Sequence, residues 1–418
     1  MHQALARFQI SSLAWRLAFL YAALFFVVGC YLPYMPVWLK WRGLGDDAIA
    51  FLLATPLFCR VLFTPAIAFA ADWTGSRRTI LILLAWGSLL GFLALWASGS
   101  FWQMLLAILL LALNWPTLMP LIETIAMSGM RNSGLDYGKV RLWGSGSFIL
   151  ASFGCGLLIG AVGAVSILPV LVIFSALTVV GVHFLPRELA RQAGTSSAPR
   201  RLKLSDAASL ARSQSFLLFL AAASAVQSSH ALFYAFGTIH WREQGIADGT
   251  IGVLWSLGVI AEIALFAVSG RVLAAWGAGR LLLAASLAAV LRWGFMAIDP
   301  PLPVIFLLQC LHAFSFGAAH LAAMYFLSEA VPEDRSATAQ GIYAAAVAGL
   351  GLGLVTLACG PLYRSLGGEA YAVMALLAFV GVLCVLFLMR RWRGERVIGP
   401  IRVQPHSADG PGSTVPEI

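Results

Sequence analysis

The chain has 418 residues, of which 60% are apolar and only 11% are charged, and its mean hydropathy is +0.87. A water-soluble chain carries charge on about a quarter of its residues, because its surface has to be solvated. The composition therefore excludes an ordinary soluble protein and predicts an integral membrane protein. The six cysteines lie inside apolar runs without paired spacing, so neither a disulfide framework nor a metal site is expected.

Twelve membrane-spanning helices are predicted along the chain. A helix needs about 20 apolar residues to cross a bilayer, and charged and Gly/Pro-rich clusters cut the chain into segments of that size. The predicted spans are Leu17–Leu39, Ile49–Ala70, Ile80–Ala97, Phe101–Ala126, Val140–Ala161, Ser166–Phe184, Phe216–Ile239, Ile251–Val272, Leu281–Ala297, Leu302–Leu327, Gln340–Leu362 and Ala370–Met389.

The longest predicted connection divides these spans into two sets of six. We expect an N-terminal six-helix bundle over residues 1–185, a cytoplasmic linker over 186–215, a C-terminal six-helix bundle over 216–392 and a disordered tail over 393–418. This all-α organisation is typical of transporters in which one bundle rocks against the other around a site near the bilayer midplane.

The basic residues predict the orientation. Of the 27 Lys and Arg residues, twenty fall on the side of the N-terminus and the even-numbered connections, four fall on the other side, and three lie inside spans. Because cytoplasmic connections carry the excess of Lys and Arg, both termini are expected in the cytoplasm of a bacterial-type inner membrane. Topology thus explains the net charge of +9, and no nucleic-acid partner is expected.

The connection between the second and third spans reads DWTGSRR at residues 72–78. It resembles the loop signature of the major facilitator superfamily. That resemblance implies a gating loop formed by Asp72, Gly75, Arg77 and Arg78.

Two further runs are more specific. LDYGKVRLWGS at residues 135–145 and LWSLGVIAE at residues 254–262 are similar to the 3-phenylpropionic acid transporter family, which is related to lactose permease-type proton symporters. The resemblance implies the major facilitator fold and a transporter rather than an enzyme, with a small-molecule substrate and protons as its partners and no cofactor. Further matches to that family are Arg60, Asn114, Gln227, His230, Tyr234, Arg292, His320 and Gln340.

Charged side chains inside the spans are the main candidates for function, because burying a charge in a membrane costs a few kcal/mol. Glu123 and Arg141 lie near the same end of spans four and five, so they are expected to face each other. Such a pair offers hydrogen-bonding groups to a polar substrate, and it resembles the acidic-basic pair that binds sugar in lactose permease. The alternative is a purely structural pair, or an Arg141 side chain that reaches the interface.

A second set predicts proton coupling. Glu262 and His312 fall at comparable depths in spans eight and ten, and Arg292 lies somewhat further out in span nine, so the three are expected to lie near one another. A carboxyl group in a low-dielectric cavity can hold a proton at neutral pH and release it when an arginine approaches. The set resembles the proton-translocation residues of lactose permease, except that Gln309 and Ser315 stand where that protein has Lys and Glu. The alternative is that Glu262 only forms hydrogen bonds within the C-terminal half.

Arg60 lies in the middle of span two, too deep to reach the interface, and needs an anionic partner. A substrate carboxylate is one such partner, and Glu123 or a backbone carbonyl is the other. Aromatic side chains such as Tyr31 and Trp115 would then hold the ring of an aromatic acid. The residues predicted to bind substrate are Arg60, Asn114, Glu123, Arg141, Gln227, His230, Tyr234 and Trp255.

These features predict a secondary active transporter that takes up a small aromatic carboxylate together with protons, as a monomer. A sugar or nucleoside proton symporter is the first alternative, and an exporter of drugs or metabolites with the same fold is the second. Enzymes are disfavoured because no phosphate-binding loop, metal-ligand cluster or Ser/His/Asp arrangement is present in the sequence.

Overall fold

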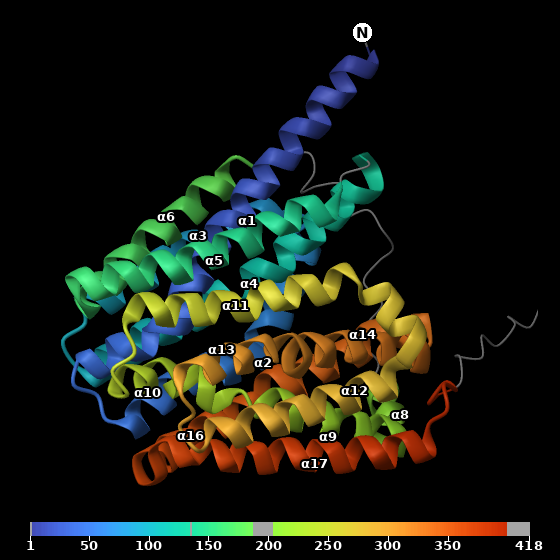
Figure 1. Ribbon diagram of the computed structural model, residues 1–418. Helices are drawn as coiled ribbons and strands as arrows, with labels where there is room; N and C mark the ends of the chain where they lie inside the picture. Colours follow the sequence, from blue (N-terminus) through green and yellow to red (C-terminus); the bar gives the residue numbers. More distant parts are fainter. Residues whose placement is uncertain (1, 134–135, 187–203, 399–418) are drawn as a thin grey trace, which may run out of the picture.

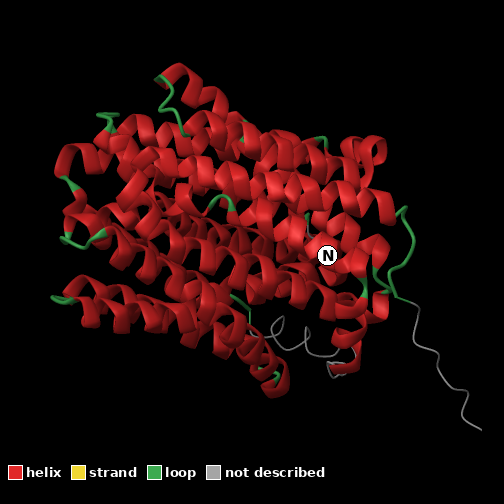
Figure 2. Cartoon of the chain, turned by 90° about the horizontal axis from the view of Figure 1, so that it is seen from below, coloured by secondary structure: helices red, strands yellow, loops and turns green. Residues whose placement is uncertain are grey.

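The structure is a computed structural model that describes residues 2–133, 136–186 and 204–398. Throughout this part of the chain the secondary structure is helical, and long helices run side by side along one direction (Figure 1). No strand occurs in the described residues, as the view from below also shows (Figure 2). The all-α membrane fold predicted from composition is therefore confirmed.

Six long helices form the N-terminal half. They are apolar over lengths that cross a bilayer, and proline residues are tolerated inside three of them, as is common in membrane helices. Their bounds are α1 His2–Trp41, α2 Asp46–Thr74, α3 Arg77–Ala97, α4 Phe101–Ser133, α5 Tyr137–Val162 and α6 Ile167–His183.

The C-terminal half is built from interrupted helices. Three of its spans contain a wider, π-helical segment near the middle, a feature often found at functional sites. The first combines α9 Gln214–Ser228, η2 Phe233–Gly237 and α10 Thr238–Glu243; the second combines α13 Leu302–Cys310, η3 Ala313–Ala318 and α14 Ala319–Ala330; the third combines α15 Ser336–Tyr343, η5 Ala344–Gly351 and α16 Leu352–Leu366. The other long helices of this half are α11 Asp248–Ala267, α12 Ser269–Met296 and α17 Ala370–Arg391.

Two details differ from the predicted spans. The described residues contain 11 candidate membrane spans, because the last two predicted spans run on as one helical stretch, Ser336–Arg391, joined by the short turn Gly367–Glu369. The predicted eighth span is too long: α11 ends at Ala267, since Val268 leaves the helical conformation, and the residues beyond it belong to α12. A uniformly apolar sequence does not reveal such a break.

The two halves meet mainly at one end of the molecule, which we call the far face because it lies opposite the end where α1 begins (Figure 1). There α5 packs against α11, and a Cβ at Gly156 would overlap the carbonyl oxygen of Asp248. On the other side α2 packs against α16, where Gly360 approaches the backbone of Asp47 and Arg364 pairs with the Asp47 carboxylate. The far face is thus closed by contacts that only glycine permits.

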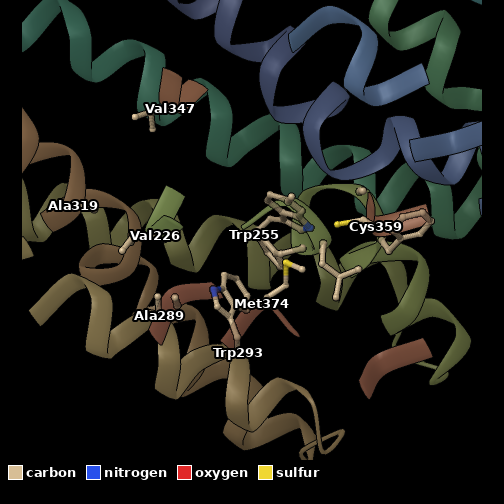
Figure 3. Packing of buried hydrophobic residues seen from close by; sticks show 14 of the residues in the cluster. Val226, Trp255, Ala289, Trp293, Ala319, Val347, Cys359 and Met374 are labelled. Atoms are coloured by element: carbon tan, nitrogen blue, oxygen red, sulfur yellow. The ribbon is translucent and has the colours of Figure 1, made fainter. Parts of the chain in front are cut away.

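The interior of the C-terminal half is closely packed. Figure 3 shows Trp255 of α11 and Trp293 of α12 within the buried apolar cluster, together with Met374 of α17. The indole of Trp293 is fully buried, and its Nε1 donates to Ser229 Oγ at 2.8 Å. This hydrogen bond ties α12 to the interruption between α9 and η2.

The predicted linker and tail are described only in part. The short helix α8, Leu204–Arg212, occupies the end of the predicted linker, and Val397 donates its backbone N–H to Ala330 at 2.8 Å. Residues 187–203 and 399–418 lie outside the described chain, so the domain boundaries and the disorder of the tail remain predictions.

Candidate functional site

Two adjoining cavities lie between the halves. The first, of about 650 Å³, reaches from the centre of the protein to the face where α1 and α5 begin, which we call the N-terminal face. The second, of about 400 Å³, lies beside α2 and α4. Both are walled by Phe25, Val28 and Leu32 of α1 and by Tyr234, so they form two lobes of one space.

Arg60 lines the second cavity from the middle of α2. It is solvent-exposed within that space, and no hydrogen bond or ion pair to it is found among the described residues. The wall around it is apolar and aromatic: the rings of Tyr31 and Trp115 lie 4.9 Å apart, and both line the same cavity. The alternative of a fixed bridge from Arg60 to Glu123 is not found among the described residues, where Glu123 pairs with Arg141.

Glu123 and Arg141 face each other at the N-terminal end of the first cavity. Glu123 Oε1 lies 3.8 Å from Arg141 Nε, and Tyr137 donates its hydroxyl to the same oxygen at 3.4 Å. The guanidinium also lies 4.4 Å from the ring centre of Phe25. Asp136 caps the start of α5 by accepting from the backbone N–H of Lys139 at 3.1 Å, and this hydrogen bond lowers the pKa of Asp136.

Arg292 is the centre of a buried polar cluster in the C-terminal half. It is fully buried in α12, and its Nη2 donates to Gln309 Oε1 at 2.8 Å. Its Nη1 donates to His312 Nδ1 at 3.0 Å and to Ser315 Oγ at 3.4 Å. The ring centres of Phe233 and Trp293 lie 4.8 and 4.5 Å from the guanidinium carbon, so aromatic faces cover the rest of the charge.

The donors and acceptors of this cluster follow from its chemistry. Because arginine only donates, His312 Nδ1 must accept and the ring proton resides on Nε2. That nitrogen lies 3.9 Å from Glu262 Oε2. Glu262 and Arg292 are therefore linked through His312 and not by direct contact, and both Glu262 and His312 line the first cavity.

His230 extends the cluster toward the interruption in span seven. Its Nδ1 lies 3.1 Å from the Val226 carbonyl, so that nitrogen carries the proton. Its Nε2 then accepts from the Ser315 hydroxyl at 3.1 Å. His230 is fully buried and is not among the residues lining either cavity. The structure thus places it behind the predicted substrate site and within the Arg292 cluster.

Tyr234 and Trp255 are the aromatic wall of the first cavity. Tyr234 lines both cavities, and its ring centre lies 6.2 Å from that of Trp255. Trp255 is stacked on Phe233 at 4.4 Å and donates its Nε1 to Thr238 Oγ1 at 2.9 Å. These contacts fix a broad aromatic surface opposite α1.

Four of the residues predicted to bind substrate, Asn114, Glu123, Gln227 and His230, are not among the residues that line either cavity. Asn114 donates its amide to the Leu110 carbonyl at 2.7 Å, and its side chain lies against Gly87 of α3, where a Cβ would overlap it. α4 is apolar around most of its circumference, so the sequence does not indicate which side of the helix faces the centre. Gln227 is half-buried on α9 and is also absent from both cavity walls.

The predicted gating loop lies at the N-terminal face between α2 and α3. Gly75 has a φ of +61°, which an L-residue rarely adopts, and allows the sharp turn. Arg78 donates to the carbonyls of Leu185 and His183 at 2.8 and 2.9 Å and so ties the start of α3 to the end of α6. Arg77 is buried, and the side chain of Asp72 lies outside the described residues.

Gln309, Ser315 and Tyr137 lie in the candidate site, although no role was predicted for them from the sequence. The first two are fully buried partners of Arg292, and Tyr137 lines the first cavity beside Glu123. The sequence contains an indication for two of them. Gln309 and Ser315 each lie three residues from His312, and residues at that spacing are neighbours on a helix surface.

Comparison with known proteins identifies relatives over most of the chain. Residues 14–373 match the model of the MFS_1 like family. The chain is 34% identical over 369 residues to a probable 3-phenylpropionic acid transporter of Escherichia coli (strain K12), covering 88% of this chain and 96% of that protein. It is 28% identical over 380 residues to the maltose permease of Geobacillus stearothermophilus, covering 89% and 94%.

Solved structures share the fold at lower identity. The nucleoside transporter NupG superposes with a TM-score of 0.78 at 18% identity, covering 91% of this chain and 100% of that one. The human organic anion transporter MFSD10 superposes with a TM-score of 0.61 at 15% identity, covering 90% and 99%. At these identities the similarity concerns the arrangement of the helices.

Proposed function

The chain belongs to the MFS_1 like family of major facilitator transporters, and on this premise we propose that it takes up a small aromatic monocarboxylate together with protons across the bacterial inner membrane. A substrate resembling 3-phenylpropionate fits this proposal, since this chain is 34% identical to a probable 3-phenylpropionic acid transporter. The cycle is one of alternating access between the two halves.

The observation that carries the proposal is the unpaired guanidinium of Arg60. A cation inside a membrane span is costly unless an anion neutralises it, and no carboxylate in the described chain pairs with Arg60. A substrate carboxylate held by two parallel hydrogen bonds supplies that anion. The surrounding apolar wall, with Tyr31 and Trp115, suits the ring of an aromatic acid.

Proton coupling rests on Glu262 and His312 in the wall of the first cavity. The two side chains lie 3.9 Å apart, and Arg292 holds the far side of the imidazole. In the proposed cycle Glu262 gains a proton on one side of the membrane and loses it on the other as His312 moves toward or away from it. In the orientation that we propose, with both termini in the cytoplasm, the closed far face and the open first cavity correspond to an inward-facing state.

Uptake into proteoliposomes tests the proposal. Purified protein is reconstituted, and accumulation of radiolabelled 3-phenylpropionate is followed with and without an inwardly directed proton gradient. We expect accumulation above equilibrium only with the gradient, abolished by a protonophore. Arg60→Ala should lower the affinity for 3-phenylpropionate at least tenfold. Arg60→Lys should recover part of that affinity, because lysine restores the positive charge but not the two parallel N–H donors of the guanidinium. Binding that does not depend on Arg60 would refute the carboxylate site.

A sugar or nucleoside symporter is the second candidate. It is favoured by the Glu123–Arg141 pair, whose carboxylate and guanidinium both suit hydroxyl groups, and by the similarity to maltose permease. Maltose, uridine and 3-phenylpropionate are compared as competitors in one binding assay. Competition by maltose or uridine alone would favour this candidate. Net extrusion in whole cells would instead favour an exporter.

A further inference from the structure

Gln309 presents an unpaired hydrogen-bond donor in the wall of the first cavity. Its side chain is 1% exposed and lines that cavity from α13. Oε1 accepts from Arg292 Nη2 at 2.8 Å, whereas Nε2 has no hydrogen-bond partner among the residues that the structure describes. Buried donors are almost always paired, so an orphan donor at a cavity wall calls for a partner from the cavity.

The direction of this carboxamide is determined by Arg292. Arginine only donates, so turning the amide over would place two donors against each other. The Nε2 group therefore cannot satisfy itself on Arg292. The last torsion of a glutamine side chain is soft, which allows the N–H₂ group to swing toward a ligand while Oε1 stays within reach of the guanidinium.

Local charge also favours an electron-rich ligand atom. Arg292 forms hydrogen bonds with Gln309, His312 and Ser315, and no carboxylate pairs with it in the part of the chain that the structure describes. The positive charge behind Gln309 polarises the carboxamide and strengthens its N–H bonds toward oxygen.

The position of Gln309 relative to Arg60 determines which end of a bound substrate Gln309 contacts. Arg60 lines the second cavity from the N-terminal half, and Gln309 lines the first cavity from the C-terminal half. Tyr234 lines both cavities, so the two lobes adjoin beside it, and the lobe that contains Gln309 is open to the far end of a molecule anchored at Arg60.

We propose that Gln309 is a specificity-determining residue that donates to an oxygen on the ring end of the substrate, opposite the carboxylate held by Arg60. The preferred substrate is then an aromatic monocarboxylate with an oxygen substituent on its ring. This inference rests on the proposed function. A substrate that touches Arg60 and Gln309 links the two halves, so the same two contacts that select it also favour closure around it.

Binding of five acids by purified protein tests the inference: 3-phenylpropionate, its meta- and para-hydroxylated derivatives and its meta- and para-methoxylated derivatives. Wild-type protein should bind one hydroxylated and one methoxylated isomer about five- to tenfold more tightly than the plain acid. Gln309→Leu should bind all of them with the affinity of the plain acid.

The variant Gln309→Glu tests the loss of the hydrogen-bond donor separately from a loss of correct folding. It preserves an acceptor for Arg292 and nearly the same volume, but it presents an oxygen where the N–H₂ group was. We expect this variant to keep the hydroxylated acid, whose O–H can donate to the new carboxylate, and to lose the preference for the methoxylated acid, which cannot donate. Gln340→Leu, on the exposed side of α15 and away from both cavities, is the matched control and should retain both preferences.

The outcomes separate the inference from the proposed function. If wild-type protein binds all the acids equally and Arg60→Ala abolishes binding, Gln309 does not form a hydrogen bond with the substrate and the inference is wrong. The carboxylate site at Arg60 is then still supported. If both Gln309 variants keep the preference for the hydroxylated and methoxylated acids over the plain acid, another residue recognises the ring oxygen and the inference is wrong. If no aromatic acid binds at all, the proposed function and the inference both fail.

Discussion

The imidazole of His312 lies with Nε2 3.9 Å from Oε2 of Glu262, while its other nitrogen accepts from Arg292. This distance is too long for a hydrogen bond, so the carboxyl group is poised beside the imidazole and not fixed to it. A shift of about one ångström closes the contact, which joins the cavity wall to the buried Arg292 cluster. The position of one ring thus decides whether Glu262 has a partner.

Replacing Glu262 by Gln removes the group that carries the proton in the proposed cycle and retains its size. We expect proton-driven accumulation to fall to the equilibrium level, while exchange of labelled for unlabelled substrate across the membrane continues. The measurement is counterflow and gradient-driven uptake in the same proteoliposomes. Glu329→Gln, an exposed carboxylate on α14, is the control and should accumulate normally. Normal accumulation by Glu262→Gln would assign the proton to another group.

The Glu123–Arg141 pair is expected to act on binding more than on stability. Both side chains are partly exposed, 40% and 32%, and exposed pairs contribute only about 0–1 kcal/mol to folding. Glu123→Ala and Arg141→Ala should therefore each abolish measurable substrate binding and shift the melting temperature little. Thermal denaturation with and without substrate measures both effects. Arg271→Ala, exposed on α12, should change neither. A large loss of stability with retained binding would make the pair structural.

Arg78 should contribute to stability and not to substrate affinity. Its guanidinium donates to two carbonyls at the end of α6, and hydrogen bonds from a charged donor contribute about 1.5–3 kcal/mol when shielded from water and less when exposed. Arg78→Ala should lower the melting temperature, and Arg78→Lys should recover little because lysine cannot bridge both carbonyls. Arg280→Ala, an exposed arginine of α12, is the control. Equal melting temperatures for Arg78→Ala and wild type would contradict this role.

Gly360 should determine how often the far face opens. A side chain there would overlap the backbone of Asp47, so Gly360→Val should displace α16 from α2 and shift the population toward opening at that face. The assay uses Thr356→Cys, which lines the second cavity, in a protein whose native cysteines are alanine. When Gly360→Val is added to this protein, the rate at which an impermeant maleimide labels Thr356→Cys from the far face should rise several-fold.

The control for this experiment is Gly294→Val, because a Cβ at Gly294 meets nothing within 4 Å. Labelling in that background should match the wild-type rate. Unchanged labelling in the Gly360 variant would show that the α2–α16 contact does not limit opening.

Hydropathy was sufficient to locate the spans, although not the helix break at Val268, because the cost of burying backbone and charge in a bilayer is the same in every fold of this kind. It also indicated which charges are out of place, and the structure brings Glu262, His312 and Arg292 together. Depth along a helix can be counted at about 1.5 Å per residue, which explains why residues on three different helices were predicted to meet.

Rotation about a helix axis is what the sequence did not reveal. Asn114 turns toward α3 and His230 lies behind the cavity wall, although both were predicted to bind substrate. In a membrane both faces of a helix are apolar, so the pattern that orients a helix in a soluble protein is weak. Gln309 was noted only as a departure from lactose permease, and its partner becomes apparent once α12 and α13 are placed side by side.

The π-helical segments give the C-terminal half a second property. A π-turn holds one residue more than an α-turn, and one residue corresponds to a rotation of about 100° around the helix axis. Converting η3 into a regular α-helix would therefore swing the residues on one side of it, His312 or His320, to a different azimuth while the helix ends stay in place. The described helices of the N-terminal half contain no π-helical segment, so such a change of side-chain direction is open only to the half that contains Glu262 and His312.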